Sequence, residues 1–127
     1  MKDSFKHSSP IYIQLADRIK RRILRREMKP GEKLPSVREM AVECGVNPNT
    51  VQRTYSELER MGIVETRRGQ GTFITEDADR LEELRKELRQ RQIESFVQSM
   101  EEMGFGPREI LSGLEAYLKE AEGREKQ

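Results

Sequence analysis

Two short helical patterns separated by a tight turn restrict the fold of this sequence more than any other feature. Ser36 is a good N-cap residue, and Glu39 three residues later completes a capping box. Gly45 predicts the end of the first helix, because glycine adopts a positive φ at little cost. Asn47 is placed to cap the next helix, and Pro48 takes its first position, where no N–H is needed. The sequence therefore predicts a helix, a turn of a few residues and a second helix.

The second predicted helix has two different faces. Val51, Tyr55, Leu58 and Met61 recur at helical spacing and predict a buried stripe. The other face carries side chains that form hydrogen bonds with base edges and phosphates: Asn49, Thr50, Gln52, Arg53 and Ser56. A helix with a polar N-terminal half, braced by a short helix across a turn, is typical of the helix-turn-helix motif.

A glycine-containing hairpin is expected after this motif. Residues 63–66 and 73–75 are short β-branched runs, and the loop between them holds Arg67, Arg68, Gly69, Gln70 and Gly71. The glycines let a backbone approach a phosphate or the minor groove, and the arginines supply charge. We predict a DNA-binding wing, with an ordinary solubilising turn as the alternative. No Lys-Ser or Lys-Thr pair follows, which argues against a nucleotide-binding loop.

The N-terminal part of the chain is predicted to be helical after a loose arm at residues 1–9. Residues 10–28 place Ile11, Leu15, Ile19 and Ile23 on one apolar face. The opposite surface, expected to be solvated, carries basic residues: Arg18, Lys20, Arg21, Arg22, Arg25 and Arg26. It either serves solubility alone or lies near DNA phosphates.

The charge of the chain is unevenly distributed. Residues 1–75 carry 15 lysines and arginines against 9 acids, whereas residues 76–127 carry 9 against 14. A basic N-terminal part suggests contact with a polyanion, and chance variation in surface charge is the alternative. We expect residues 10–75 to form a DNA-binding domain.

Residues 76–127 predict two helices separated by Gly104 and Pro107, with the charged stretch after Lys119 fraying. A helical hairpin of about 50 residues cannot form a proper core alone. We expect it to build a homodimer through an isologous interface, the alternative being that it packs back on its own N-terminal domain. The expected dimerisation residues are apolar: Leu81, Leu84, Leu88, Ile93, Phe96, Val97, Met100, Ile110, Leu114 and Leu118.

Several functions find no support in the sequence. Cys44 is the single cysteine, so we expect a small buried hydrophobe, with a redox sensor as the alternative. His7 is the sole histidine and has no partners at catalytic or metal-ligand spacing, so neither an enzyme nor a metal or other cofactor is expected. No apolar run is long enough to cross a membrane and no signal-peptide core is present, so we expect a cytoplasmic protein.

With these motifs in place, residues 10–75 closely resemble the DNA-binding domain of the GntR family of bacterial repressors. The runs that match lie at residues 10–12, 31–41, 46–51 and 69–72. Within that family, the C-terminal region around Phe96 and residues 103–105 resembles the YtrA-type subgroup. Met100, Met103 and Phe105 are expected to be plain packing there, with an effector pocket of unknown ligand as the alternative.

The resemblance implies a mainly α-helical winged helix-turn-helix protein with a small β-hairpin and a two-helix dimerisation tail. It implies a dimeric repressor on palindromic double-stranded operator DNA, and in this subgroup the controlled genes often encode ABC transporters. The DNA-contacting positions that the resemblance carries over are Ser36, Arg38, Asn47, Asn49, Thr50, Gln52, Arg53, Gly69, Gln70 and Gly71. A winged helix that contacts protein or RNA is the alternative, and binding to duplex DNA that weakens steeply with salt distinguishes the two.

Overall fold

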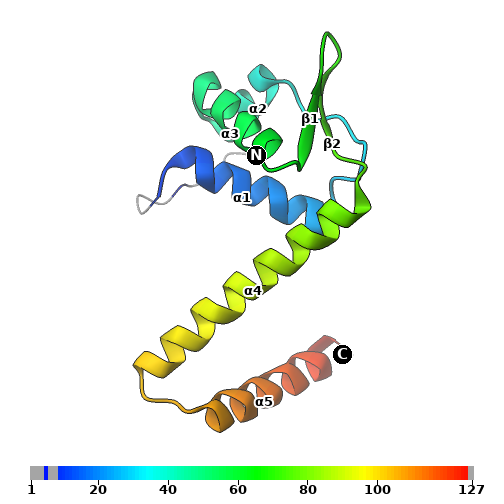
Figure 1. Ribbon diagram of the computed structural model, residues 1–127. Helices are drawn as coiled ribbons and strands as arrows, with labels where there is room; N and C mark the ends of the chain where they lie inside the picture. The colour runs from blue at the N-terminus through cyan, green and yellow to red at the C-terminus, as the bar shows by residue number, and fades with distance from the viewer. Residues whose placement is uncertain (1–4, 6–8, 126–127) are drawn as a thin grey trace. The chain divides into compact units, whose positions relative to one another are not determined.

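The computed structural model describes Phe5 and residues 9–125 of the chain (Figure 1). Five helices and one hairpin follow one another: α1 (Ile11–Leu24), α2 (Val37–Cys44), α3 (Pro48–Arg60), β1 (Val64–Arg67), β2 (Gly71–Ile74), α4 (Ala78–Glu102) and α5 (Pro107–Glu125). The chain divides into two compact units with the boundary after Arg85, inside α4. We call them the head unit, up to Arg85, and the tail unit, from Lys86 onward. The expected mainly helical fold with a small hairpin is confirmed.

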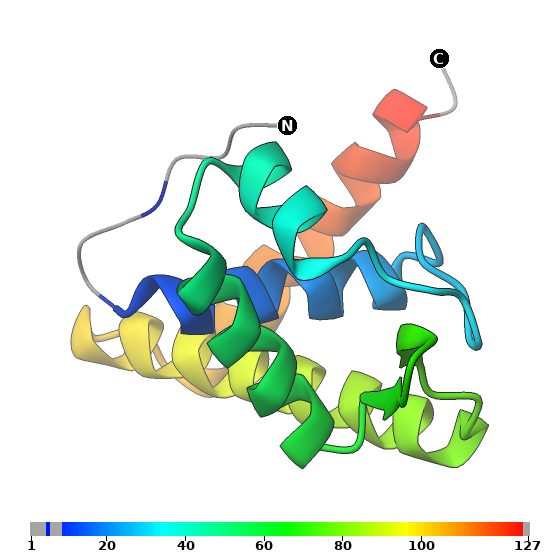
Figure 2. The same ribbon diagram turned by 90° about the horizontal axis from the view of Figure 1, so that it is seen from above.

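The head unit is built around α3. This helix packs against both α1 and α2, and Figures 1 and 2 show it alongside α1. The core side chains that these helices and the hairpin contribute are almost completely covered: Leu15, Ile19, Met40, Val51, Leu58, Ile63 and Ile74. Burial of so many aliphatic groups is the main source of stability for a unit of this size.

The hairpin is antiparallel, and a third segment pairs with it. Val64 stands opposite Ile74 and Arg67 opposite Gly71. On the other edge of β2, Leu34 donates its N–H to Thr72 O at 2.8 Å, and Ile74 donates to Glu32 O at 2.9 Å. The hairpin is therefore held to the segment that leads into α2.

The predicted helix ends around the turn are confirmed. The N–H of Glu39 donates to Ser36 Oγ at 3.1 Å, and the N–H of Ser36 donates to Glu39 Oε1 at 2.9 Å, which completes the capping box. Gly45 ends α2 with a φ of 66°, in the left-handed region. Asn47 Oδ1 caps α3 by accepting the N–H of Asn49 at 2.7 Å.

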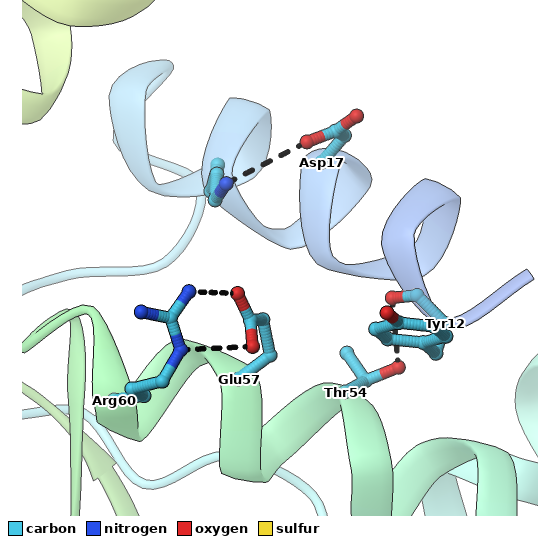
Figure 3. A network of polar contacts seen from close by, with 6 residues as sticks. Tyr12, Asp17, Thr54, Glu57 and Arg60 are labelled. Atoms are coloured by element: carbon cyan, nitrogen blue, oxygen red, sulfur yellow. Dashed lines mark hydrogen bonds and ion pairs between the residues drawn. The ribbon is translucent and has the colours of Figure 1, made fainter. Parts of the chain in front are cut away.

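Two predictions about the N-terminal helix are wrong. The helix ends at Leu24 rather than near Met28, because Arg26 has a left-handed φ of 63° and the turned chain buries Met28 in the core. The basic surface is also not wholly solvated, because Lys20 is only 5% exposed. The Nζ of this buried side chain keeps a charged partner, because it lies 3.6 Å from Asp17 Oδ1; Figure 3 draws this contact as the dashed line that ends at Asp17.

Two element boundaries also differ from prediction. Arg67 and Gly71 belong to the strands, so the loop at the hairpin tip is shorter than expected. The second tail helix continues to Glu125, so the stretch after Lys119 is helical and not frayed as predicted. None of the described helices combines the length and apolar character that crossing a bilayer requires.

The tail unit contains the C-terminal part of α4 and all of α5. The link between them turns at Gly104, whose φ is 88°, and the N–H of Phe105 donates to Met100 O at 3.1 Å. Pro107 opens α5 as predicted. Large apolar side chains on both helices are exposed: Ile93, Phe96, Leu111, Leu114, Tyr117 and Leu118. The unit leaves much apolar surface uncovered within one copy of the chain.

Candidate nucleic-acid interface

The first half of α3 presents a polar surface to solvent. Asn47, Asn49, Gln52 and Arg53 are exposed, and Thr50 is half-buried. The opposite stripe is buried, as predicted from Val51, Tyr55 and Leu58, although Met61 is only half-buried. The helix thus offers amide and guanidinium groups on the side that does not contact the protein core.

Tyr55 fixes α3 to the segment before α2. Its hydroxyl donates to Pro35 O at 2.7 Å. Burial raises the pKa of Tyr55 far above its ordinary value, so the phenol stays protonated and remains a donor. Ser36 and Arg38, at the start of α2, are therefore held in a defined position relative to α3.

The two candidate residues at the start of α2 differ in their hydrogen bonding and exposure. Ser36 Oγ accepts the capping hydrogen bond, which leaves the hydroxyl proton free to donate to a phosphate. Arg38 is exposed. The hydrogen bonds from the backbone and side chain of Ser36 lower the pKa of Glu39, so this carboxylate stays charged near the candidate surface.

Arg53 is placed by a residue of α1 that sequence reasoning did not assign to the site. The guanidinium carbon lies 3.9 Å from the centre of the Tyr12 ring, in a cation–π contact. Thr54 Oγ1 lies 3.0 Å from the carbonyl oxygens of both Tyr12 and Thr50, which ties α1 to α3 at the same level (Figure 3). The available signal was Tyr12 itself, an aromatic residue with a polar tip beside the apolar face of α1.

In the C-terminal half of α3 the single base, Arg60, is neutralised by an acid, and Glu59 adds a further negative charge. Arg60 forms a two-point ion pair with Glu57, as Figure 3 shows. The hydrogen bond from Arg60 lowers the pKa of Glu57 and keeps it ionised. Arg53 feels the charge of Glu57 but forms no ion pair among the described residues, so the positive charge that α3 can offer to a polyanion is concentrated in its first half.

The hairpin tip combines two different arginines. Arg67 stacks over the ring of Phe73 at 4.2 Å and lies 3.6 Å from Glu65 Oε1, so it is partly held by the strands. Arg68 is exposed, and among the described residues it has no acidic partner. Gly69 and Gln70 complete the exposed turn. The turn is closed by a hydrogen bond in which the N–H of Gln70 donates to Arg67 O at 2.8 Å.

The two glycines of the hairpin have different surroundings. A Cβ at Gly69 would have no heavy atom within 4 Å, so this position is open to a ligand. A Cβ at Gly71, whose φ is 119°, would lie 2.7 Å from Lys33 Cε. The Lys33 side chain can move aside, so glycine is favoured at this position mainly by its φ, which side chains other than glycine rarely allow.

The ten apolar residues predicted for dimerisation fall into three groups. Leu84 is completely covered within one copy and so has no surface left for a second one, and Ile110, at 8% exposure, has little. The half-buried ones are Leu81, Leu88, Val97 and Met100; the exposed ones are Ile93, Phe96, Leu114 and Leu118. The N-terminal part of α4 packs on the head instead, where Arg80 Nε donates to Met61 O at 2.8 Å.

Other candidate chemistry is not supported by the described residues. Cys44 is buried as predicted, and burial raises the pKa of its thiol, which keeps it protonated and unreactive. Among the residues that the structure describes, no three His, Cys, Asp or Glu side chains gather where a metal ion would fit. His7 lies outside the described residues.

The chain is similar to several known bacterial proteins. The family model described as "Bacterial regulatory proteins, gntR family" matches residues 11–74. The uncharacterized HTH-type transcriptional regulator YhcF of Bacillus subtilis is 55% identical over 119 residues, which cover 94% of this chain and 98% of that protein. The HTH-type transcriptional repressor YtrA of the same organism is 56% identical over 71 residues, which cover 56% of this chain and 55% of that protein.

A solved structure extends the similarity to the tail unit. A GntR family transcriptional regulator from Listeria monocytogenes superimposes with a TM-score of 0.83 and 38% sequence identity. The superposition covers 88% of this chain and 98% of that chain. The similarity therefore includes the helices after the hairpin as well as the head unit.

Proposed function

Because the chain belongs to the GntR family of bacterial regulatory proteins and resembles its YtrA-like members, we propose that this DNA-binding transcriptional regulator is a dimeric repressor of a palindromic operator. The observation that carries the proposal is the pairing, in one head unit, of a polar, exposed α3 surface with a hairpin tip that bears Arg68. We assign DNA binding to residues 10–75 and dimerisation to residues 76–127. Such a repressor would act in the cytoplasm.

In the proposed complex, the first half of α3 enters the major groove. Arg53 and Arg38 read guanine or grip phosphate, while Asn49 and Gln52 lie where amide groups reach adenine. The phosphates of the DNA backbone are held by Asn47, Thr50 and Ser36, because helix N-termini and hydroxyl groups commonly bind phosphate.

The hairpin reaches the adjacent minor groove in this proposal. Arg67 and Arg68 provide the charge, and Gly69, Gln70 and Gly71 form the turn that approaches the sugar-phosphate backbone. The open surroundings of Gly69 support this assignment, since nothing in the described chain obstructs an approaching strand there.

Dimerisation is supported by the uncovered apolar side chains of the tail unit. Phe96 is 41% exposed and Leu118 is 54% exposed, on two helices of the same unit. A second copy would cover these groups through an isologous contact. Two heads would then read half-sites about one helical turn apart, on the order of 34 Å.

Oligomeric state is tested by sedimentation equilibrium of the full chain. Phe96→Asp should shift the mass toward the monomer, because a buried, unpaired carboxylate opposes the contact. Ser95→Asp is the matched control, since Ser95 is an exposed neighbour on the same helix, and it should leave the dimer intact. A wild-type chain that stays monomeric at all concentrations contradicts the dimer.

The operator is tested by selecting bound duplexes from a random pool. We expect the enriched sequences to contain an inverted repeat, and the affinity to fall steeply with salt. Arg53→Ala should weaken operator binding, whereas Arg60→Ala, which removes an ion-paired arginine of the same helix, should change it little. Equal effects of the two substitutions would remove Arg53 from this role.

Repression is supported by the name of the relative YtrA, a transcriptional repressor. The resemblance to the YtrA-type subgroup supports an operon for an ABC transporter as the target. Deletion of the gene should raise the transcripts of the operons that carry the selected operator. Lower transcripts would instead assign an activator, and targets without transporter genes would remove that part of the proposal.

A further inference from the structure

An open pocket of about 510 Å³, called the cavity below, lies in the head unit between the end of α1 and the first turns of α4. Its apolar lining includes Ile23, Leu24, Pro30 and Leu81. The volume lies in the range of cavities that hold small organic ligands, and a mostly apolar lining with a few polar groups is typical of them. Leu81, which was predicted from the sequence to take part in dimerisation, lines this cavity.

The charged groups of the cavity are predominantly basic. Arg26, Lys29 and Arg85 line it together with a single acid, Glu82. Arg85 Nη1 lies 3.3 Å from Leu24 O, at the end of α1. In the part of the chain that the structure describes, neither Arg26 nor Lys29 forms an ion pair, so their charges remain available to an anion.

Arg26 also has an unusual backbone. Its φ of 63° is left-handed, and it is the single non-glycine residue with a positive φ among those described. The turn is fixed on both sides, because the N–H groups of Glu27 and Met28 point to Arg22 O at 2.9 and 3.3 Å, and Met28 is buried. A glycine would adopt this conformation more easily, so an arginine here suggests that its side chain is used.

We propose that this cavity binds a small amphipathic anion, a carboxylate or phosphate group carried on an apolar chain. The anionic group pairs with Arg26 and Lys29, and the apolar chain covers Leu24 and Leu81. None of the residues that line the cavity is among those assigned to DNA contact. The site therefore goes beyond the operator proposal and is tested without DNA.

The test is calorimetric titration of the full-length protein with octanoate and octyl phosphate. Octanol supplies the same chain without charge, and acetate and inorganic phosphate supply the charge without the chain. We expect saturable binding of at least one amphipathic anion, with octanol at least about tenfold weaker, since a charge-assisted hydrogen bond contributes on this scale. The stronger of the two anions identifies the head group.

Three variants locate the site. Arg26→Asn keeps a residue that tolerates left-handed φ and removes the charge, and Lys29→Gln removes the second charge. Each should weaken binding about tenfold. Arg25→Gln is the matched control, because the exposed Arg25 pairs with Glu27 and does not line the cavity, and it should bind as the wild type does. Thermal melts establish that each variant is folded, and Lys29→Gln preserves the test if Arg26→Asn does not fold.

Four results would overturn the proposal. Octanol that binds as tightly as octanoate and octyl phosphate would show that charge plays no part in recognition. Equal weakening by Arg25→Gln and Arg26→Asn would show only nonspecific attraction to a basic protein. Absence of heat with every probe would exclude the ligand class. A change of particle mass in Lys29→Gln would assign the cavity to contact with a second copy.

Discussion

Tyr12 should contribute to operator affinity through Arg53, although it is not itself assigned a DNA contact. Replacing Tyr12 with leucine removes the ring that lies 3.9 Å from the guanidinium carbon. The hydrogen bond from Thr54 is made to the backbone carbonyl of Tyr12 and survives the substitution. The change therefore isolates the ring from the link between α1 and α3.

The expected magnitude follows from the exposure of the pair. A cation–π contact at an exposed site is worth about 0.5–1 kcal/mol, which corresponds to about two- to fivefold in affinity if the contact preorganises Arg53. Loss of Arg53 itself should cost more, about 1–3 kcal/mol if it makes a bidentate base contact. Tyr12→Phe keeps the ring and should stay within about twofold of the wild type.

The assay is a double-substitution cycle measured by fluorescence anisotropy on the selected operator. If Tyr12 acts through Arg53, then Tyr12→Leu should have almost no effect in the Arg53→Ala background. A full two- to fivefold loss in that background would refute the reasoning, and so would a Tyr12→Phe variant as weak as Tyr12→Leu. Thermal melts of all variants separate lost affinity from lost folding.

Three further predictions concern the stability and reactivity of the head unit. The hydrogen bonds from Ser36 lower the pKa of Glu39 in the folded state. Their contribution to stability is therefore present above the pKa of the unfolded state and is lost as the pH falls through the pKa of the folded state. The difference in melting temperature between the wild type and Glu39→Gln should narrow from pH 7 to pH 3. The Cys44 thiol, buried and with a raised pKa, should react with a thiol reagent only after unfolding, and rapid labelling of the native protein would restore a redox role. Gly71→Ala should be more destabilising in urea than Gly69→Ala, which should cost about 1 kcal/mol for its left-handed φ of 75°, because the φ of 119° at Gly71 lies outside the left-handed region that other residues adopt; equal denaturation midpoints would contradict this backbone argument.

The features that the sequence predicted correctly are determined by interactions between close neighbours in the chain. The capping box joins Ser36 and Glu39 across three residues, and the cap of Asn47 reaches two residues. Such contacts depend on residue type and spacing alone, so the two helices and their turn were predictable. The hairpin was also predictable, because its two strands are neighbours in the chain, although the loop at its tip is shorter than predicted.

The errors and omissions arise from contacts between distant parts of the chain. The helix α1 ends early where the turned chain buries Met28 in the core. The side chain of Lys20 is buried by the packing of the head unit around it. Tyr12 and Arg53 lie on different helices and meet only after α1 packs on α3. The cavity likewise combines residues near positions 23–30 and 78–85, and no local pattern brings these together.

The boundary between the two compact units falls inside the uninterrupted helix α4, which runs from Ala78 to Glu102. A flexible linker would tolerate a gained or lost residue, but a helix turns about 100° and advances 1.5 Å for each one. Within α4, a single insertion after Arg85 would therefore turn each later side chain by about 100° around the helix axis. An insertion of about seven residues, close to two whole turns, would instead leave the apolar positions of this helix in the same phase.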